Sequence, residues 1–253
     1  MKSDSPLRQQ LFPFKFDLVY TFENFFVFEG NETAFGMAKK ICDEVADMEK
    51  SFFFHGETGC GKTHLLHAIG NELAAKQPGM AVKFLPLGRT LEELSRSPDT
   101  EGAVVGLVSR YKDSGALLVD DVEDASPYPA LQESLFHLFN HFRETQKLFI
   151  ATGKNPPTRT NSLSPRLASR LAWGLTARLG PPDEEAKRKI LKRLAGEKKL
   201  ALEEKEIDYI LNHYPRDFRS LRLIIEEINR YSLLTRRKAT IPLIQEALGS
   251  LEK

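Results

Sequence analysis

A single eight-residue segment restricts what this chain of 253 residues can fold into more than any other feature. Residues 56–63 read GETGCGKT and match the phosphate-binding loop pattern at every specified position. An apolar run at 51–54 precedes the segment and a helical pattern at 62–75 follows it, as such loops require. The glycines let backbone amides converge on phosphate oxygens, and the helix N-terminus adds positive partial charge. We therefore predict a nucleotide site formed by Gly56, Thr58, Gly59, Cys60, Gly61, Lys62, Thr63 and His64.

A pair of carboxylates is predicted to complete this site. The apolar run at 117–119 ends in Asp120 and Asp121. In such folds this strand ends beside the phosphate loop, so Asp120 would hold Mg²⁺ with the hydroxyl of Thr63, and Asp121 would polarise the attacking water. Lys62 would reach the β- and γ-phosphates. A simple turn after a strand is the competing interpretation, but the position about 60 residues beyond the loop favours the metal role.

The order of apolar and helical patterns predicts the fold class. Helical patterns separate five apolar runs, at Ser51–Phe54, Ala81–Leu87, Ala116–Val119, Lys147–Thr152 and Leu175–Leu179. This alternation predicts an α/β fold, in which helices cover both faces of a parallel sheet. After Gly180-Pro181-Pro182 only helices are expected, at Asp183–Ala195, Leu202–Tyr214, Phe218–Leu234 and Thr240–Leu251. We predict a tail at 1–19, a nucleotide-binding base at 20–181 and a small helical domain at 182–253.

Charge and cysteine content restrict the class of protein. The chain holds 36 basic and 35 acidic residues, a formal net charge of +1. This balance argues against a protein that coats nucleic acid or membranes, and predicts no strong direct DNA binding. Two cysteines, Cys42 and Cys60, exclude a disulfide framework and suit a reducing compartment. Because no signal-like or membrane-spanning run is found, we expect a cytoplasmic protein without membrane association.

Three segments of the chain resemble the DnaA family of bacterial replication initiators. Residues 20–25 (YTFENF) are similar to the start of that family's ATPase region, and residues 61–71 (GKTHLLHAIGN) to its phosphate loop and following helix. Residues 166–175 (RLASRLAWGL) resemble its arginine-bearing segment. The resemblance extends over residues 17–251 and implies an AAA+ ATPase base with a helical lid, which binds ADP or ATP with Mg²⁺.

The layout of the chain resembles the Hda group of this family. DnaA continues past the lid into a helix-turn-helix DNA-binding domain and begins with a separate domain and linker, whereas this chain stops at Lys253 and starts with a short tail. Hda proteins promote hydrolysis of DnaA-bound ATP together with the DNA-loaded sliding clamp. The resemblance therefore implies DnaA and the DNA polymerase III sliding clamp (its beta subunit) as partners, inhibition of re-initiation as the outcome, and a capacity for self-oligomers.

The tail resembles a sliding-clamp-binding peptide, in which a glutamine stands a few residues before an apolar pair. The residues concerned lie within 8–14 (RQQLFPF). Two registers are open, Gln9 with Phe12 and Phe14, or Gln10 with Leu11 and Phe14. A short peptide with apolar anchors and one polar anchor suits docking into a pocket, and an aromatic arm packed on its own domain is the alternative. The phenylalanines from Phe22 to Phe28 are expected to line the core or the adenine pocket.

Several basic residues take roles from the family by position. Arg170 matches the arginine finger, which would project toward nucleotide held by a neighbouring subunit and stabilise charge on the γ-phosphate. Arg166, one turn earlier, would contact that subunit. Arg219 matches the lid arginine that contacts the chain's own nucleotide, with Arg222 as the alternative. A solvated basic helix face is the competing interpretation of the first two arginines.

One departure from the family pattern concerns the residues after the fourth predicted strand. The family has an acidic sensor residue after the Thr-Gly or Thr-Ser pair, whereas Thr152-Gly153 is followed here by Lys154 and Asn155. Asn155 would substitute if the register shifts by one residue. The change leaves ATP hydrolysis by this chain open and favours a protein that binds nucleotide as a structural switch.

Two alternatives to an Hda-like regulator stay open. One is a nucleic-acid-binding ATPase or helicase loader, and the other is a species-specific adaptor with the same fold.

Overall fold

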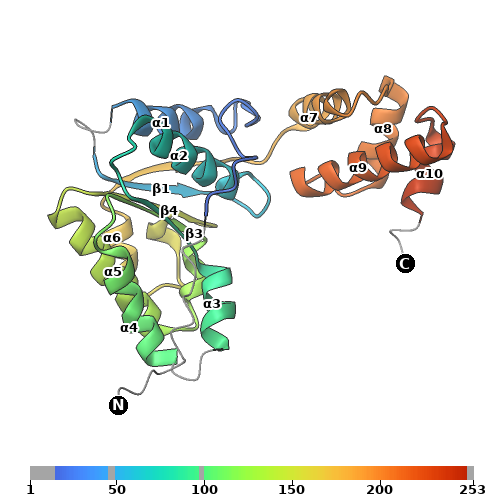
Figure 1. Ribbon diagram of the computed structural model, residues 1–253. Helices are drawn as coiled ribbons and strands as arrows, with labels where there is room; N and C mark the ends of the chain where they lie inside the picture. Colours follow the sequence, from blue (N-terminus) through green and yellow to red (C-terminus); the bar gives the residue numbers. More distant parts are fainter. Residues whose placement is uncertain (1–14, 45–48, 97–99, 250–253) are drawn as a thin grey trace, which may run out of the picture. The chain divides into compact units, whose positions relative to one another are not determined.

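The computed structural model describes residues 15–44, 49–96 and 100–249, which divide into two compact units (Figure 1). The first unit holds the described residues up to Phe25 together with Glu32–Gly56 and Lys62–Leu179. The second holds Phe26–Asn31, Glu57–Gly61 and the residues from Gly180 onward. None of the helices in the described ranges is long and apolar enough to cross a bilayer.

The first unit is built on a five-stranded parallel sheet with the strand order β2–β3–β4–β1–β5. Its strands are β1 (Ser51–His55), β2 (Val82–Pro86), β3 (Ala116–Asp120), β4 (Leu148–Gly153) and β5 (Leu175–Arg178). Every residue of β3 and β4 is buried, as expected for parallel strands covered on both faces. The five predicted strands are confirmed, and each boundary lies within one residue of its prediction.

Helices cover both faces of this sheet, as predicted (Figure 1). One face carries α1 (Glu32–Asp43) and α2 (Lys62–Lys76), and the other carries α5 (Pro129–Glu144) and α6 (Pro165–Leu171). Helix α4 (Thr100–Tyr111) packs against α5, and α3 (Leu87–Ser95) packs against α4. Two short 3₁₀ turns are η1 (Val122–Ala125) and η2 (Pro157–Arg159). The apolar stripe of α5 is buried in the core at Leu131, Leu135, Leu138, Phe139 and Phe142.

Strand order decides which loops meet at the edge of the sheet. Because β4 pairs with both β1 and β3, the carboxyl ends of these three strands lie next to one another. Ligands of parallel sheets bind outside such ends. The sequence places the phosphate loop after β1 and the aspartate pair at the end of β3, so the fold brings both to this edge.

The second unit contains four helices, α7 (Glu184–Glu197), α8 (Glu204–His213), α9 (Phe218–Thr235) and α10 (Ile241–Leu248), which confirms the predicted helical segment. Side-chain caps begin two of these helices. At α7 the Asp183 carboxylate accepts a hydrogen bond from the Ala186 amide at 2.7 Å, and at α9 the Asp217 carboxylate accepts one from the Ser220 amide at 3.0 Å. A capping box begins α8, and α10 has proline in its first turn. The unit has its own apolar core, which includes Ile190, Leu194, Ile207, Leu221, Ile225 and Leu243.

Candidate functional site

The phosphate loop, residues 56–63, connects β1 to α2 as predicted. Gly59 and Gly61 have positive φ angles of 83° and 100°, which residues with a side chain rarely adopt. The backbone amide of Gly56 donates to the carbonyl of Gly153 at 3.1 Å and so fastens the start of the loop to the end of β4. The amide of Cys60 donates to the Glu57 carbonyl at 3.2 Å. Its side chain is buried, as suits a small residue within a tight turn.

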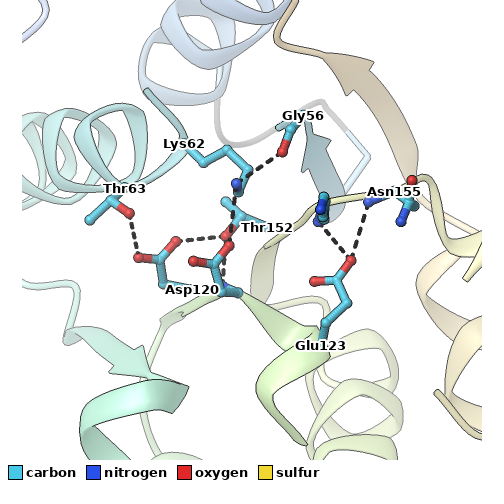
Figure 2. Close-up of polar contacts among 9 residues, drawn as sticks. Gly56, Lys62, Thr63, Asp120, Glu123, Thr152 and Asn155 are labelled. Atoms are coloured by element: carbon cyan, nitrogen blue, oxygen red, sulfur yellow. Dashed lines mark hydrogen bonds and ion pairs between the residues drawn. The ribbon is translucent and has the colours of Figure 1, made fainter. Parts of the chain in front are cut away.

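Lys62 is the first residue of α2 and is only 6% exposed. Its Nζ donates to the carbonyl of Gly56 at 2.9 Å and lies 3.4 Å from the Asp121 carboxylate (Figure 2). The ammonium is therefore held where the loop meets the end of β3. A lysine in this position can bind phosphate oxygens that enter the loop.

The predicted metal ligands, Thr63 and Asp120, are in direct contact. The Thr63 hydroxyl donates to one carboxylate oxygen of Asp120 at 2.7 Å, and the Thr152 hydroxyl donates to the other at 2.6 Å (Figure 2). Burial raises the pKa of Asp120, and the hydrogen bond from Thr152 opposes that rise. A carboxylate and a hydroxyl are the hard oxygen ligands that Mg²⁺ prefers, so this donor set fits that ion.

Asp121 adopts a left-handed backbone conformation, with φ 51° and ψ 68°. Such a conformation is uncommon for a residue other than glycine and often occurs at functional sites. The Asp121 amide donates to the hydroxyl of Thr152 at 2.8 Å, and its half-exposed carboxylate faces Lys62. Thr152 thus holds both aspartates, a role that the sequence analysis did not assign to it.

The backbone of the loop after β4 is bound by a carboxylate that the sequence analysis did not identify. The carboxylate of Glu123, in η1, accepts from the backbone amides of Lys154 at 2.6 Å and Asn155 at 3.2 Å (Figure 2). A side chain at Gly153 would collide with this carboxylate, since an added Cβ would lie 2.7 Å from its oxygen. Lys154, at the predicted sensor position, therefore lies in a loop whose backbone is fixed by a glutamate from η1.

His64 holds the aromatic opening segment of the first unit. Its Nε2 lies 3.0 Å from the carbonyl oxygen of Thr21. The ring centres of Tyr20 and Phe25 lie 4.9 and 5.0 Å from the centre of the imidazole ring. Phe22 and Phe25 are buried, as expected for residues that line the core or the adenine pocket. The contribution of His64 to nucleotide binding stays a prediction.

The two arginines of α6 lie one helical turn apart against aromatic rings. Arg166 forms an ion pair with Glu133 at 3.4 Å and lies 4.5 Å from the ring centre of Phe136. The guanidinium of Arg170 lies 3.9 Å from the ring centre of Trp173. The helix starts with Ser164, whose hydroxyl accepts from the Leu167 amide at 3.4 Å. Arg170 also lies 5.5 Å from the ring centre of Phe136, so both arginines lie on the α5 side of the helix.

Some predicted residues fall where the structure gives no side-chain description. The clamp-peptide residues Gln9, Gln10, Leu11, Phe12 and Phe14 lie outside the described residues. Arg219 is the second residue of α9, and only its backbone is described. The alternative, Arg222, forms an ion pair with Glu226 at 3.2 Å within the same helix.

Comparison with known protein families shows to which family this chain belongs. A family model described as "Bacterial DnaA ATPAse domain" matches residues 16–178. The chain belongs to this family. A second model, described as "Hda, lid domain", matches residues 183–248. The protein is therefore a DnaA-related, Hda-like AAA+ protein, with the family's base and lid in the order that the sequence analysis expected.

Named relatives agree with this assignment. The chain is 31% identical over 233 residues to the chromosomal replication initiator protein DnaA of Lactobacillus johnsonii, covering 92% of this chain and 51% of the relative. It is 32% identical over 232 residues to that of Lactiplantibacillus plantarum, with the same coverage of 92% and 51%. The chain thus spans about half the length of the curated relatives it matches.

Solved structures show the same fold. Domain III of Thermotoga maritima DnaA superposes with a TM-score of 0.82 at 28% identity, covering 94% of this chain and 98% of that one. DnaA from Aquifex aeolicus bound to AMPPCP gives a TM-score of 0.73 at 30% identity, covering 84% and 66%. A replication initiator DnaA bound to AMPPCP and single-stranded DNA gives 0.73 at 29% identity, covering 94% and 69%.

Proposed function

We propose that this chain is an Hda-like regulator of replication initiation, which promotes hydrolysis of ATP bound to DnaA and so inhibits re-initiation. In this function it binds ADP or ATP, docks on the DNA polymerase sliding clamp through its N-terminal tail, and presents Arg170 to its partner in the cytoplasm. Membership of the DnaA family and the Hda-type lid support the assignment. The chain acts mainly as an activator of a partner's chemistry.

Nucleotide binding rests on the phosphate loop. Its backbone amides and the buried ammonium of Lys62 would bind the phosphates, as the AMPPCP-bound relatives suggest. Thr63 and Asp120 would hold Mg²⁺, which neutralises phosphate charge when bound. Asp121, beside Lys62, would orient a water molecule. In the second unit Arg219 would couple the nucleotide to the lid.

The observation that carries the regulatory role is the environment of Arg170. Among the described residues it has no carboxylate partner, whereas Arg166 is paired with Glu133. A guanidinium held by aromatic faces keeps its positive charge available for an external anion. The γ-phosphate of ATP in a neighbouring subunit is such an anion, and an arginine there accelerates hydrolysis by stabilising the transition state. Arg166, with its neighbour Glu133, would contact the same subunit or a second copy of this chain.

Docking on the sliding clamp is supported by the sequence of the tail. Gln9 or Gln10 with the apolar residues Leu11, Phe12 and Phe14 provides one polar and two apolar anchors in either register. Such a tail would bring the chain to DNA that carries a loaded clamp. Direct DNA binding is not needed for this role, in agreement with the net charge of +1.

The decisive experiment measures conversion of DnaA-bound ATP to ADP in the presence of DNA-loaded clamp. We expect Arg170→Ala to abolish the stimulation and to retain clamp binding in a pull-down. Arg110→Ala, an exposed arginine at the end of α4, is the matched control and should stimulate normally. Full stimulation by Arg170→Ala would show that the finger assignment is wrong.

A second variant tests whether the tail docks on the sliding clamp. The triple substitution Gln9→Ala/Gln10→Ala/Phe14→Ala should lose clamp pull-down and, with it, clamp-dependent stimulation. Retention of clamp binding by this variant would remove the tail from the proposal.

A second candidate function is an ATPase that assembles on single-stranded DNA, because one similar structure is a DnaA bound to such DNA. It predicts ATP-dependent oligomers and an affinity for DNA that falls steeply with salt. Fluorescence anisotropy with labelled single strands separates the two functions. Tight, salt-sensitive binding together with ATP-dependent assembly would favour this candidate.

A further inference from the structure

Trp173 is the only tryptophan of the chain, is 51% exposed and is the second residue after the end of α6. Two guanidinium groups lie over its ring, that of Arg170 at 3.9 Å and that of Arg143 at 4.2 Å from the ring centre. Half-exposed indoles are commonly explained by packing alone. Two cations over one ring instead indicate that the π face of this residue binds charge.

The backbone on both sides of Trp173 is fixed. Its amide donates to the carbonyl of Arg170 at 3.1 Å, which ends the helix. The next residue, Gly174, packs so closely on the backbone of Ser51 that an added Cβ would collide with the Ser51 carbonyl. Strand β5 then begins at Leu175 and pairs with β1. The indole is therefore attached to a rigid point between α6 and the sheet.

Arg170 has few other restraints. Its Nε is buried and has no hydrogen-bond partner in the described part of the chain, and its second aromatic neighbour, Phe136, lies farther away at 5.5 Å. An arginine side chain has several rotatable bonds and a high rotamer entropy. Without a stacking partner, the guanidinium would sample many positions at the edge of the unit.

We infer that Trp173 is a positioning residue for Arg170: its indole face fixes the guanidinium in the orientation required to meet the phosphates of a neighbouring subunit. Arg143 occupies the same ring and restricts where Arg170 can stack, because like charges repel. This inference rests on the proposed function of Arg170. A carboxylate in place of the indole would neutralise the finger, whereas an aromatic face orients it without neutralising its charge.

The stacking is tested first in the isolated chain. Since Trp173 is the sole tryptophan, quenching of its fluorescence by acrylamide measures how far the two guanidiniums cover the ring. We expect the quenching constant to rise in Arg170→Ala and in Arg143→Ala and to stay unchanged in the control Arg110→Ala. An unchanged constant in Arg170→Ala would overturn the stacking itself, whatever the function of the chain.

The positioning role is tested in the DnaA hydrolysis assay. Trp173→Leu should lower the maximal stimulated rate roughly tenfold, because loss of orientation acts on the transition state, and should leave the half-saturating concentration unchanged. Trp173→Phe should recover part of the rate, since it restores an aromatic face. The double variant Arg170→Ala/Trp173→Leu should be no slower than Arg170→Ala alone.

The outcomes separate this inference from the function on which it rests. If Arg170→Ala stimulates normally, the proposed function fails. If Arg170→Ala is inactive while Trp173→Leu retains the full rate, the positioning role is wrong and the function stands. A raised half-saturating concentration with an unchanged maximal rate would make Trp173 a partner contact and would overturn the inference.

Discussion

Replacing Thr152 by valine would remove one hydroxyl from the centre of the candidate nucleotide site and keep the shape of the side chain. Thr152 is fully buried, donates to Asp120 at 2.6 Å and accepts from the Asp121 amide at 2.8 Å. Loss of a hydrogen bond to a charged group costs about 1.5–3 kcal/mol, and an unpaired buried amide costs about 1–3 kcal/mol. Since the added methyl returns about 0.8 kcal/mol, we expect a net destabilisation of about 2–5 kcal/mol.

The pH dependence of this effect follows from Asp120. Burial raises the pKa of Asp120, and the hydrogen bond from Thr152 counteracts that rise, so the valine variant should raise the pKa further. A carboxyl whose folded pKa lies above the unfolded value destabilises the protein once pH exceeds the folded pKa, and has no such effect below the unfolded value of about 3.9. The stability difference between variant and wild type should therefore be largest at neutral pH and shrink on acidification.

Urea unfolding followed by Trp173 fluorescence measures this difference, because Trp173 belongs to the same unit as Thr152. The matched control is Thr152→Ser, which keeps the hydroxyl and loses one buried methyl, at a cost of about 1 kcal/mol. If the valine variant is as stable as the serine variant at neutral pH, the hydroxyl does not hold the two aspartates and the reasoning fails.

Two further predictions concern α2. Lys62→Ala should weaken ADP binding at least about 100-fold in calorimetry, because a buried charge-assisted contact to phosphate is lost; an unchanged affinity would place the nucleotide elsewhere. Burial lowers the pKa of His67, whose Nδ1 accepts from the Asp17 amide at 3.0 Å. Its neutral form is favoured by folding, so stability should fall as pH drops below about 6.5. His67→Asn should flatten this dependence in urea titrations, and an unchanged slope would exclude His67 as its source.

The elements that the sequence predicted have strong local signals, and those that it missed do not. The five strands are continuous apolar runs between turn residues, and the helices of the second unit start at Asp183, Asp217 and Thr240. By contrast, no prediction was made for α1, α3 or α4. Helix α4 contains Gly102, Gly106 and valines of low helix propensity, and its packing against α5 compensates for that propensity.

The residues of the candidate site likewise divide into those that the sequence predicted and those that only the structure revealed. The sequence by itself predicted the phosphate loop and the aspartate pair, because each is a short motif whose chemistry depends on neighbouring residues, and the resemblance to the DnaA family pointed to the arginines of α6. Only the tertiary structure assigned Thr152 to the aspartates, Glu123 to the loop after β4, and Trp173 to Arg170 and Arg143. Apart from Trp173 and Arg170, which are near in sequence, these partners lie about 30 residues apart in the chain. They meet because β4 pairs with β3 and because α5 packs against α6, and a linear pattern contains neither the strand register nor the helix packing.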